Sequence, residues 1–211
     1  DQKRKAGKEN SLAVITGPTI APEVADGVLT NALVASEDIQ LAEELANGLS
    51  TETFLLSPAN DPRGAELWGA FKNVIALGCG IADGLPEGSG DNLKAAIFTV
   101  GFSEAKRLMA ELGAEPETAY SAAGLGDLFV TATSSHGRNR TLGQKLGSGR
   151  TLEEAMAETV MVAEGVRAAR MFAATASKRK LIAPFVSAIN DLLDNKINST
   201  DCVKRILAGN F

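Results

Sequence analysis

Short apolar stretches alternate with amphipathic stretches over residues 12–58. Three of the apolar stretches are rich in aliphatic and β-branched residues, namely LAVIT (12–16), NALVAS (31–36) and TETFLLS (51–57). Runs of this length and composition, separated by turn-forming residues, are typical of strands. The pattern therefore predicts three strands in the first part of the chain.

The stretches between these strands have helical character. Glu23–Gly27 predicts a short helix. SEDIQLAEELANG (36–48) predicts a longer one that starts at Ser36 or Asp38 and ends at Asn47-Gly48. Asp at a helix start accepts hydrogen bonds from unpaired main-chain N–H groups, and Gly or Asn commonly ends a helix. Strands and helices in alternating order predict a parallel sheet covered by helices.

From Asp61 onward the pattern is helical almost throughout. Asp61 followed by Pro62 predicts a capped helix start with proline in the first turn. A second helix is expected from about Asp91 to Gly113, and Pro116 begins a short one. The remaining amphipathic segments are Thr151–Glu158, Val162–Ala176, Ala183–Leu193 and Ser199–Leu207. The change of pattern predicts a domain boundary near Asn60, which separates an α/β domain (1–60) from an all-helical domain (61–211).

Composition excludes several classes of partner. The 211 residues carry a net charge of −5, and Lys and Arg are scattered along the chain. These features argue against a nucleic-acid surface or an anionic membrane patch. We also expect no membrane span and no signal peptide, because no sufficiently long apolar run is present. Cys79 and Cys202 show neither metal-binding spacing nor a disulfide framework, which indicates a reducing cytoplasm and no metal site.

Lys72 has an unusual position. It is the only charged residue between Glu66 and Asp83, in the run LWGAFKNVIALGCGIA. A lysine that loses hydration in such surroundings is suited to proton transfer or to nucleophilic attack. The alternative is that its aliphatic stem packs while its ammonium group reaches water.

Gly78, Gly80 and Gly84 nearly match a dinucleotide-binding glycine pattern. Their context differs, because they lie within a predicted helix and not between a strand and a helix. We therefore interpret these glycines as positions where two helices pack closely.

Asp127 and Thr131 form a polar cluster within AGLGDLFVTATS. If the segment is helical, the two residues lie one turn apart on the same side. A carboxylate among apolar and glycine neighbours requires a partner, and Lys72 is a candidate. Asp127 could instead cap a helix after a glycine turn.

The segment Gly137-Arg138-Asn139-Arg140 carries two guanidinium groups and an amide after a glycine. Arginine offers forked donors to phosphate, and glycine lets the main chain approach the ligand closely. The segment predicts a phosphate-binding site, with a solvated basic loop as the alternative.

Six segments together resemble the NAD(P)-dependent sn-glycerol-3-phosphate dehydrogenases. In chain order they are GPTIAPEVADG, ELWGAFKNVIALGCGIADG, GDNLKAAI, AGLGDLFVTATS, GRNRTLG and VAEGV. The match extends from about Leu12 to the C-terminal helices. The resemblance implies the end of a Rossmann-like parallel sheet, followed by a mainly α-helical substrate domain like the C-terminal domain of 6-phosphogluconate dehydrogenase.

The resemblance also implies a reaction, in which dihydroxyacetone phosphate and sn-glycerol 3-phosphate interconvert by hydride transfer with NAD or NADP. Lys72 would act as general acid and base, with Asp127 as a second catalytic residue. The implied substrate-binding residues are Gly17, Thr19, Lys72, Asn73, Asp127, Thr131, Gly137, Arg138 and Asn139. The implied cofactor-binding residues are Ala21, Arg138, Val162 and Glu164. A homodimer is compatible with the apolar helices.

The chain departs from the family pattern at several points. The first strand of the dinucleotide-binding domain and its glycine-rich turn are not in this sequence, so we expect the chain alone to be inactive. Because residues that meet the cofactor ribose would lie upstream, the choice between NAD and NADP stays open. Thr19 replaces a common serine but keeps the hydroxyl, and Gly137 replaces a frequent serine.

Three alternatives to this function stay open. Another hydroxyacid dehydrogenase could share the architecture and act on a different substrate. An enzyme of a different class could use Lys72 to form a Schiff base. The chain could also be a non-catalytic helical assembly module.

Overall fold

The computed structural model of the protein describes residues 11–134, 137–157 and 164–209. The chain forms two compact units: unit 1 comprises Asp1–Gly69 with Gly113–Asp127, and unit 2 comprises Ala70–Leu112 with Leu128–Phe211. The division falls within the long helix α4 (Pro62–Gly84). The domain boundary expected near Asn60 stays a prediction.

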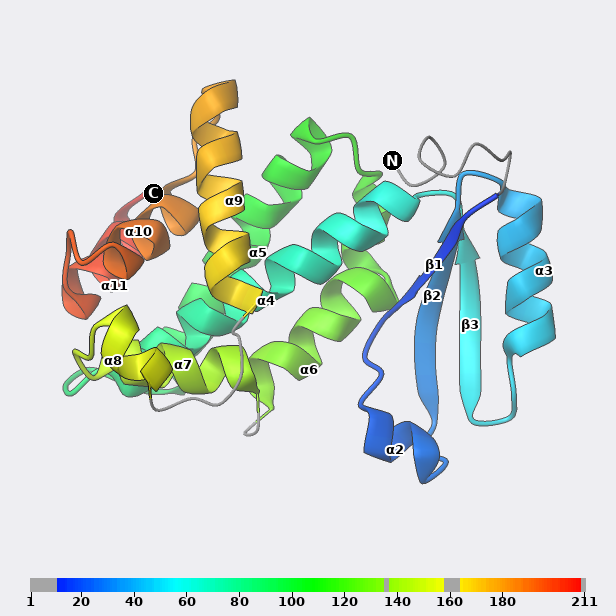
Figure 1. Cartoon of the computed structure of the whole chain (residues 1–211), viewed down its shortest axis with the longest axis horizontal. Helices are drawn as coiled ribbons and strands as arrows, with labels where there is room; N and C mark the ends of the chain where they lie inside the picture. Colours follow the sequence, from blue (N-terminus) through cyan, green and yellow to red (C-terminus); the bar gives the residue numbers. More distant parts are fainter. Residues whose placement is uncertain (1–10, 135–136, 158–163, 210–211) are drawn as a thin grey trace. The chain divides into compact units, whose positions relative to one another are not determined.

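Unit 1 contains a small sheet whose strands lie in the order β1-β2-β3 (Figure 1). The strands are β1 (Ala13–Thr16), β2 (Thr30–Ser36) and β3 (Phe54–Ala59). All three overlap the apolar stretches that predicted them, although β3 is displaced toward the C-terminus relative to the predicted stretch 51–57.

The direction of β1 differs from the prediction. β2 and β3 are parallel, as expected, but β1 runs antiparallel to β2, with Thr16 opposite Leu33. The two connections explain the difference. Between β1 and β2 the chain forms only α2 (Ala21–Ala25), which is too short to return along the length of the sheet, whereas α3 (Ile39–Leu49) crosses back between β2 and β3.

Both faces of β2 are covered at its centre, which explains the apolar run Ala32-Leu33-Val34-Ala35. Ala32 and Val34 pack with Ala46 of α3 on one face. Leu33 and Ala35 pack on the other face. This second cluster contains Ala65 of α4 and Ala123, which lies in the π-helical turn η2 (Ala122–Gly126). Successive side chains of a strand point to opposite faces, so a strand between two layers needs apolar residues at every position.

The helix starts that were predicted from capping residues are confirmed. The Asp38 carboxylate accepts hydrogen bonds from the main-chain nitrogens of Gln40 and Leu41 at 3.1 and 3.4 Å. The predicted end of α3 at Asn47-Gly48 is one residue too early. Gly48 belongs to the last turn, and the chain becomes extended only at Ser50.

Asp61 connects two segments of unit 1. Its Oδ1 accepts from the Gly64 nitrogen at 2.8 Å, which caps the start of α4. Its Oδ2 accepts from the Thr118 hydroxyl at 2.6 Å and from the Glu115 nitrogen at 2.9 Å. Thr118 lies in the 3₁₀ helix η1 (Pro116–Tyr120), so one buried carboxylate fixes η1 against the first turn of α4.

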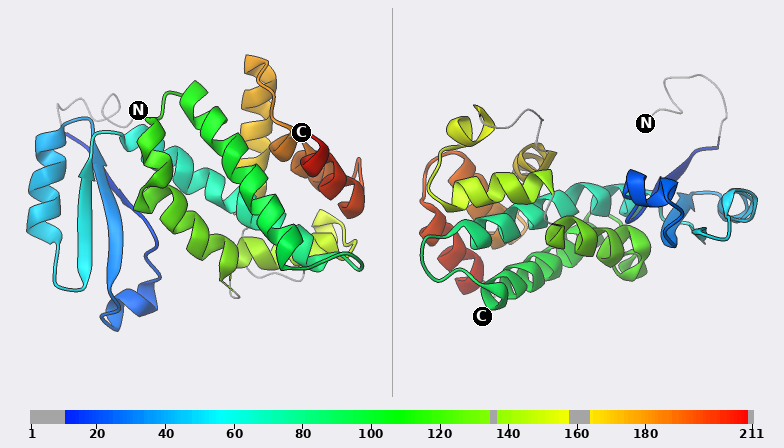
Figure 2. Two further views of the ribbon diagram at one scale, coloured as in Figure 1. Left: turned by 180° about the vertical axis from the view of Figure 1, so that it is seen from behind. Right: turned by 90° about the horizontal axis from the view of Figure 1, so that it is seen from below.

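Unit 2 is helical over its described residues (Figures 1 and 2). Besides the second part of α4, it contains α5 (Asp91–Glu111), α6 (Asp127–Thr133, from Leu128 on), α7 (Arg138–Gly147), α8 (Leu152–Ala157), α9 (Glu164–Arg179), α10 (Pro184–Leu193) and α11 (Ser199–Ala208). The helices α5 and α8 to α11 agree with the predicted segments. A helix at α6 was expected only as one possibility, and α7 was not predicted as a helix. Val162, where one segment was expected to begin, lies outside the described residues.

The core of unit 2 combines aromatic packing with a buried carboxylate. The rings of Phe71 and Phe172 meet edge to face with centroids 4.8 Å apart. Glu104 is fully buried and caps α10, because its carboxylate oxygens accept from the nitrogens of Phe185 and Val186 at 2.7 and 2.9 Å. Burial raises the pKa of Glu104, and these two hydrogen bonds partly oppose that rise.

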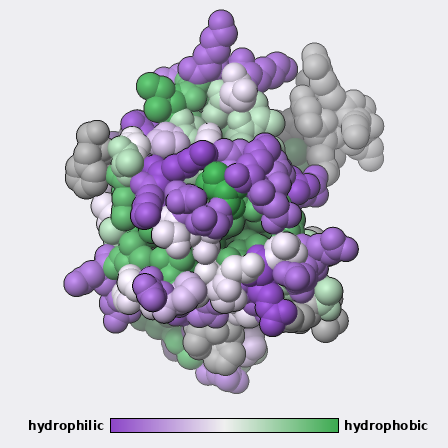
Figure 3. All heavy atoms as spheres, turned by 90° about the vertical axis from the view of Figure 1, so that its left-hand side faces the viewer, coloured by the Kyte–Doolittle hydropathy of each residue, from purple (hydrophilic) through white to green (hydrophobic). Residues whose placement is uncertain are grey.

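Hydrophilic side chains and smaller hydrophobic areas alternate over the face shown in Figure 3. This mixture agrees with the scattered charges of the sequence. Among the helices that the structure describes, none is both long enough and apolar enough to cross a bilayer.

Candidate functional site

The close helix packing expected from the α4 glycines is confirmed. Gly80 and Gly84 face a second pair, Gly143 and Gly147, on α7. A Cβ added at Gly80 would collide with the Arg140 carbonyl group, and one added at Gly143 would collide with the Leu77 carbonyl oxygen. The main chains of α4 and α7 are therefore in direct contact, which only residues without a side chain permit.

The glycine contacts also define the direction of α7. Gly80 meets residues 140 and 143, whereas Gly84 meets residues 144 and 147, so positions advance together along the two helices. α4 and α7 consequently run parallel, side by side in Figures 1 and 2. This arrangement brings the N-terminus of α7 next to the part of α4 that contains Asn73.

Asn73 and Asn139 bind one another although 66 residues separate them. Asn139 Nδ2 donates to Asn73 Oδ1 at 2.8 Å, and both residues are buried. Asn139 Oδ1 accepts from the main-chain nitrogen of Gly165 at 2.9 Å, and Asn73 Nδ2 donates to Glu164 Oε2 at 3.4 Å. We call these four residues the amide cluster. Three helices, α4, α7 and α9, meet there.

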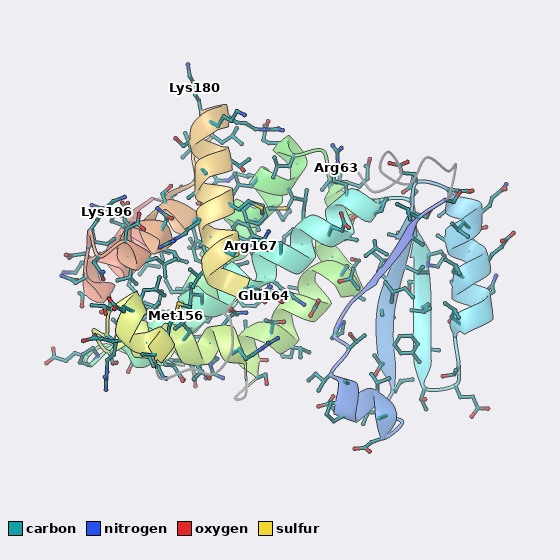
Figure 4. The ribbon with its side chains drawn as sticks, in the orientation of Figure 1. Arg63, Met156, Glu164, Arg167, Lys180 and Lys196 are labelled. Carbon is teal, nitrogen blue, oxygen red and sulfur yellow. The ribbon has the colours of Figure 1, made fainter. Side chains whose placement is uncertain are left out.

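The hydrogen bonds of the amide cluster fix the orientation of both amides. Each carbonyl oxygen has a donor and each NH₂ group has an acceptor, so turning either amide over would break two bonds. A glycine is also required at position 165. A Cβ there would lie 2.8 Å from Asn139 Oδ1 and 2.8 Å from the main-chain carbonyl oxygen of Asn73. Figure 4 shows Glu164 at the first turn of α9 and Lys180 beyond its other end.

Arg138 and Gly137 lie at the exposed start of α7. Gly137 is the N-cap residue and has no side chain with which to cap the helix. Arg138 is the first helical residue and is exposed. The N-terminus of a helix carries partial positive charge on N–H groups that lack a partner within the helix, and it attracts anions. This end of α7 is therefore a candidate site for an anion.

Arg140 does not share this role. Its Nε donates to Asp83 Oδ2 at 2.7 Å, and its Nη1 donates to the carbonyl oxygens of Thr133 and Ser134 at 2.9 and 3.3 Å. Asp83 also binds Lys94 Nζ, at 2.9 Å. We call Asp83, Lys94 and Arg140 the ion cluster. The expectation that both guanidinium groups of the GRNR segment serve a phosphate is not supported, because that of Arg140 is engaged within the protein.

Lys72 lies on α4 immediately before Asn73 and is half-buried. Its environment agrees with partial removal from water, and the amide cluster begins at the next residue. Thr131 lies one turn after Asp127 in α6, which confirms the helical spacing expected for this pair. Asp127 is buried and is assigned to unit 1, whereas Lys72 and Thr131 belong to unit 2. The pairing of Asp127 with Lys72 stays a prediction.

The other expected site residues in unit 1 lie around the turn after β1. Gly17 is buried against Ala32, and a Cβ there would lie 2.9 Å from the Ala32 Cα. Thr19 is exposed, with its hydroxyl donating to the Gly17 carbonyl oxygen at 3.4 Å, and Ala21 is the exposed first residue of α2. Their contacts with a ligand stay predictions. Val162, a proposed cofactor contact, lies outside the described residues.

Sequence reasoning missed four residues that contribute to this region. Gly143 and Gly147 repeat the four-residue glycine spacing of α4, and that repetition was the available signal. Gly165 had a weaker signal, as the glycine of VAEGV. Asp83 had none beyond being the first charged residue after Lys72, because its partners lie on α5 and α7.

Comparison with known proteins identifies the family. The protein-family model described as the C-terminus of NAD-dependent glycerol-3-phosphate dehydrogenase matches residues 61–204. The family model for the N-terminus of the same enzyme matches residues 2–42. The first match covers well over half of the chain and contains the whole of the amide and ion clusters. The chain therefore belongs to the NAD-dependent glycerol-3-phosphate dehydrogenase family.

Individual relatives agree. A glycerol-3-phosphate dehydrogenase [NAD(P)+] of Rhodospirillum rubrum is 44% identical over 95% of this chain and 57% of its own length. One from Clostridium tetani is 39% identical over 94% of this chain and 56% of its own length. The crystal structure of glycerol-3-phosphate dehydrogenase from Coxiella burnetii matches with a TM-score of 0.88 and 33% identity, over 97% of this chain and 62% of that one. The chain thus spans a little over half the length of these curated relatives.

Proposed function

We propose that this chain carries the proton-transfer and phosphate-binding residues of an enzyme that interconverts dihydroxyacetone phosphate and sn-glycerol 3-phosphate with NAD or NADP. The family match supports the reaction class. The amide cluster is the observation that carries the proposal, because it joins the segment after Lys72 to the anion-attracting start of α7. A proton donor and a phosphate site on neighbouring helices suit a phosphorylated ketone.

Lys72 is the proposed general acid. A nicotinamide cofactor supplies the hydride that reaches the ketone carbon, and negative charge then develops on the ketone oxygen. Lys72 stabilises this charge and donates the proton, and in the reverse direction it accepts the proton from the alcohol. Its half-buried position on α4 limits competition from water while leaving a route for exchange.

Arg138 and the first turn of α7 are the proposed phosphate anchor. Binding energy from the phosphate, which does not react, holds the ketone carbon in place for the transfer. Asn139 cannot turn freely, because Asn73 and Gly165 hold both ends of its amide. The start of α7 is therefore rigid before substrate binds, which reduces the cost of ordering it.

The remaining assignments follow the family. Asp127 is proposed to orient Lys72, with Thr131, Gly17 and Thr19 as further substrate contacts. Ala21, Arg138, Val162 and Glu164 are the proposed cofactor contacts. Of these, Glu164 has a defined position, because its carboxylate accepts from Asn73. A cofactor contact at Glu164 would thus be linked to the substrate side by a single hydrogen bond.

We also propose a cytoplasmic enzyme that acts as a homodimer. Cys79 and Cys202 are both free and buried, which suits a compartment where thiols stay reduced. Analytical ultracentrifugation measures the oligomeric state, and a monomer at micromolar concentration contradicts the homodimer.

The function is tested by assaying the gene product that contains this chain for oxidation of NADH and NADPH. We expect absorbance at 340 nm to fall when dihydroxyacetone phosphate is added, to fall more slowly with unphosphorylated dihydroxyacetone, and to stay constant without a ketone. Equal rates with both ketones would contradict the phosphate site. Trapping of a substrate on Lys72 by borohydride, without ketone-dependent NADH oxidation, would replace the proposal with Schiff-base chemistry.

A further inference from the structure

We infer that Arg140 is a positioning residue for the phosphate site and contributes to substrate recognition without touching the substrate. The inference rests on the proposed function, since it concerns how the start of α7 is kept ready for a phosphate. The Arg140 side chain forms hydrogen bonds with the end of α4 and with the end of α6 in unit 2. It is also linked to α5, because its partner Asp83 binds Lys94 of that helix.

The contacts of Arg140 use the planar fork of its guanidinium group. Nε is directed at the Asp83 carboxylate, while Nη1 donates to the carbonyl oxygens of Thr133 and Ser134, where α6 ends. The last carbonyl groups of a helix have no partner within it, so a guanidinium group here satisfies them. Lysine has a single point charge on a flexible stem and cannot keep donors in these two directions with the same rigidity.

The Ser134 carbonyl oxygen connects Arg140 to the N-cap of α7. This oxygen also accepts from the Gly137 nitrogen at 3.3 Å, and the Gly137 carbonyl oxygen accepts the first helical hydrogen bond, from Thr141 at 2.9 Å. Arg140 therefore fixes the Ser134 carbonyl oxygen, which is the hydrogen-bond acceptor of the Gly137 nitrogen. The main-chain carbonyl group of Arg140 packs directly against Gly80 of α4.

Asp83 keeps the Arg140 fork turned away from a bound phosphate. The Arg140–Asp83 contact is 2.7 Å long, and the two side chains are only 16% and 12% exposed. Charge-assisted hydrogen bonds are strongest in such partly buried places. The two arginines of the GRNR segment thus have different roles: exposed Arg138 contacts the ligand, and Arg140 fixes the N-cap of the helix on which Arg138 lies.

The test compares Arg140→Met and Arg140→Lys with wild type in the gene product that contains this chain. At saturating cofactor, we expect Arg140→Met to raise KM for dihydroxyacetone phosphate about tenfold or more, to change kcat by less than about threefold, and to leave kcat/KM for unphosphorylated dihydroxyacetone unchanged. Arg140→Lys should give an intermediate KM, because it keeps the charge pair and loses the fork. Arg205→Met, which removes an exposed arginine paired with Asp191 on α11 and α10, is the matched control and should behave as wild type.

Hydrogen exchange gives a readout that does not depend on activity. Main-chain amides of residues 137–141 should exchange faster in Arg140→Met than in wild type or in Arg205→Met. Equal losses on both ketones, or a KM for Arg140→Lys and Arg140→Met within twofold of wild type, would overturn the inference. If Arg140→Met does not fold, Arg140→Lys alone decides by the same two criteria. A wild-type protein without activity on dihydroxyacetone phosphate contradicts the proposed function instead, and unchanged exchange then separately contradicts the positioning role.

Discussion

Two polar clusters lie along the contact between α4 and α7, and they use opposite chemistry. The amide cluster is neutral at its centre, where buried Asn73 and Asn139 bind at 2.8 Å. The ion cluster joins Asp83 to Arg140 and Lys94 at 2.7 and 2.9 Å, with side chains that are 12–22% exposed. Glycine pairs bring the two helices together between and beyond these clusters.

The difference shows where charge is tolerated in this unit. Burying an ion is costly unless it is paired, whereas a fully hydrogen-bonded amide can be buried at little cost. Among the described residues, no buried side-chain nitrogen or oxygen lacks a hydrogen-bond partner. Under the proposed function, a neutral amide pair would place no fixed ion beside the two charged groups assigned to the reaction, which are Lys72 and Arg138.

Replacing Lys72 should give the largest effect and should separate chemistry from structure at the amide cluster. We expect Lys72→Ala to lower kcat for dihydroxyacetone phosphate reduction by about 10²–10⁴-fold, the usual contribution of a positioned acid. The melting temperature should change little, because Asn73 keeps its hydrogen bonds. Lys204→Ala, at an exposed position of α11, is the control. Wild-type turnover in Lys72→Ala would exclude the assigned role.

Replacing Gly143 should damage both clusters together. A Cβ in Gly143→Ala would meet the Leu77 carbonyl oxygen and lie 2.8 Å from Gly80 Cα, so the helices must separate. We expect a loss of about 3 kcal/mol in the free energy of unfolding, measured with urea. Gly48→Ala in α3 is a matched control with nothing within 4 Å of its added Cβ, and it should be neutral or stabilising by up to about 1 kcal/mol. Similar values for the two variants would mean that α4 and α7 do not pack this closely.

Introducing a charge tests whether the buried amide pair at the centre of the amide cluster must be neutral. In Asn139→Asp, one oxygen keeps the Gly165 hydrogen bond, but the other faces Asn73 Oδ1 without a proton between them. We expect a loss of about 2 kcal/mol at pH 7. Protonation restores a donor, so the new carboxyl group should have a raised pKa. Stability should therefore recover as pH falls from 7 toward 4, relative to wild type at each pH.

The control for this variant is Asn31→Asp, at an exposed position of β2. It should show no comparable recovery on acidification. A pH-independent loss in Asn139→Asp would indicate that the hydrogen-bond directions of the cluster differ from those described.

Removing one charge from the ion cluster should have the smallest effect. Hydrogen bonds to Asp83 and then to Asp91 raise the pKa of Lys94 above its ordinary 10.5. Such a group stabilises the fold below pH 10.5, and this stabilisation is lost as pH rises through the folded-state pKa. Since Lys94 is partly exposed, we expect Lys94→Met to cost less than about 1 kcal/mol at pH 8 and the difference from wild type to shrink above pH 10.5. A loss above about 2 kcal/mol would show that the ion cluster contributes as much to the free energy of unfolding as the amide cluster.

The sequence was a good guide wherever a structure depends on neighbouring residues. Asp38 and Asp61 cap helices because their carboxylates reach nitrogens two or three residues away. The apolar run of β2 shows directly that both faces are covered. The α4 glycines indicated a close helix contact, although not which helix would supply it.

Contacts between distant residues were beyond such reasoning. The direction of β1 depends on where the chain re-enters the sheet, and the alternation of strands and helices does not encode that. Arg140 looks like a phosphate ligand in GRNR, and only its approach to Asp83, 57 residues earlier, shows otherwise.

By itself, the sequence indicated the three strands, most of the helices and the family, because local hydrogen bonds, hydrophobic periodicity and motifs extend over a few residues. It also singled out Lys72 as a candidate for acid–base chemistry, which stays a prediction. Tertiary structure alone decided that Asn73 meets Asn139, that Arg138 faces outward and that Arg140 faces inward. The physical reason is that a hydrogen bond acts over about 3 Å, so its partners are defined only after packing has brought the helices together.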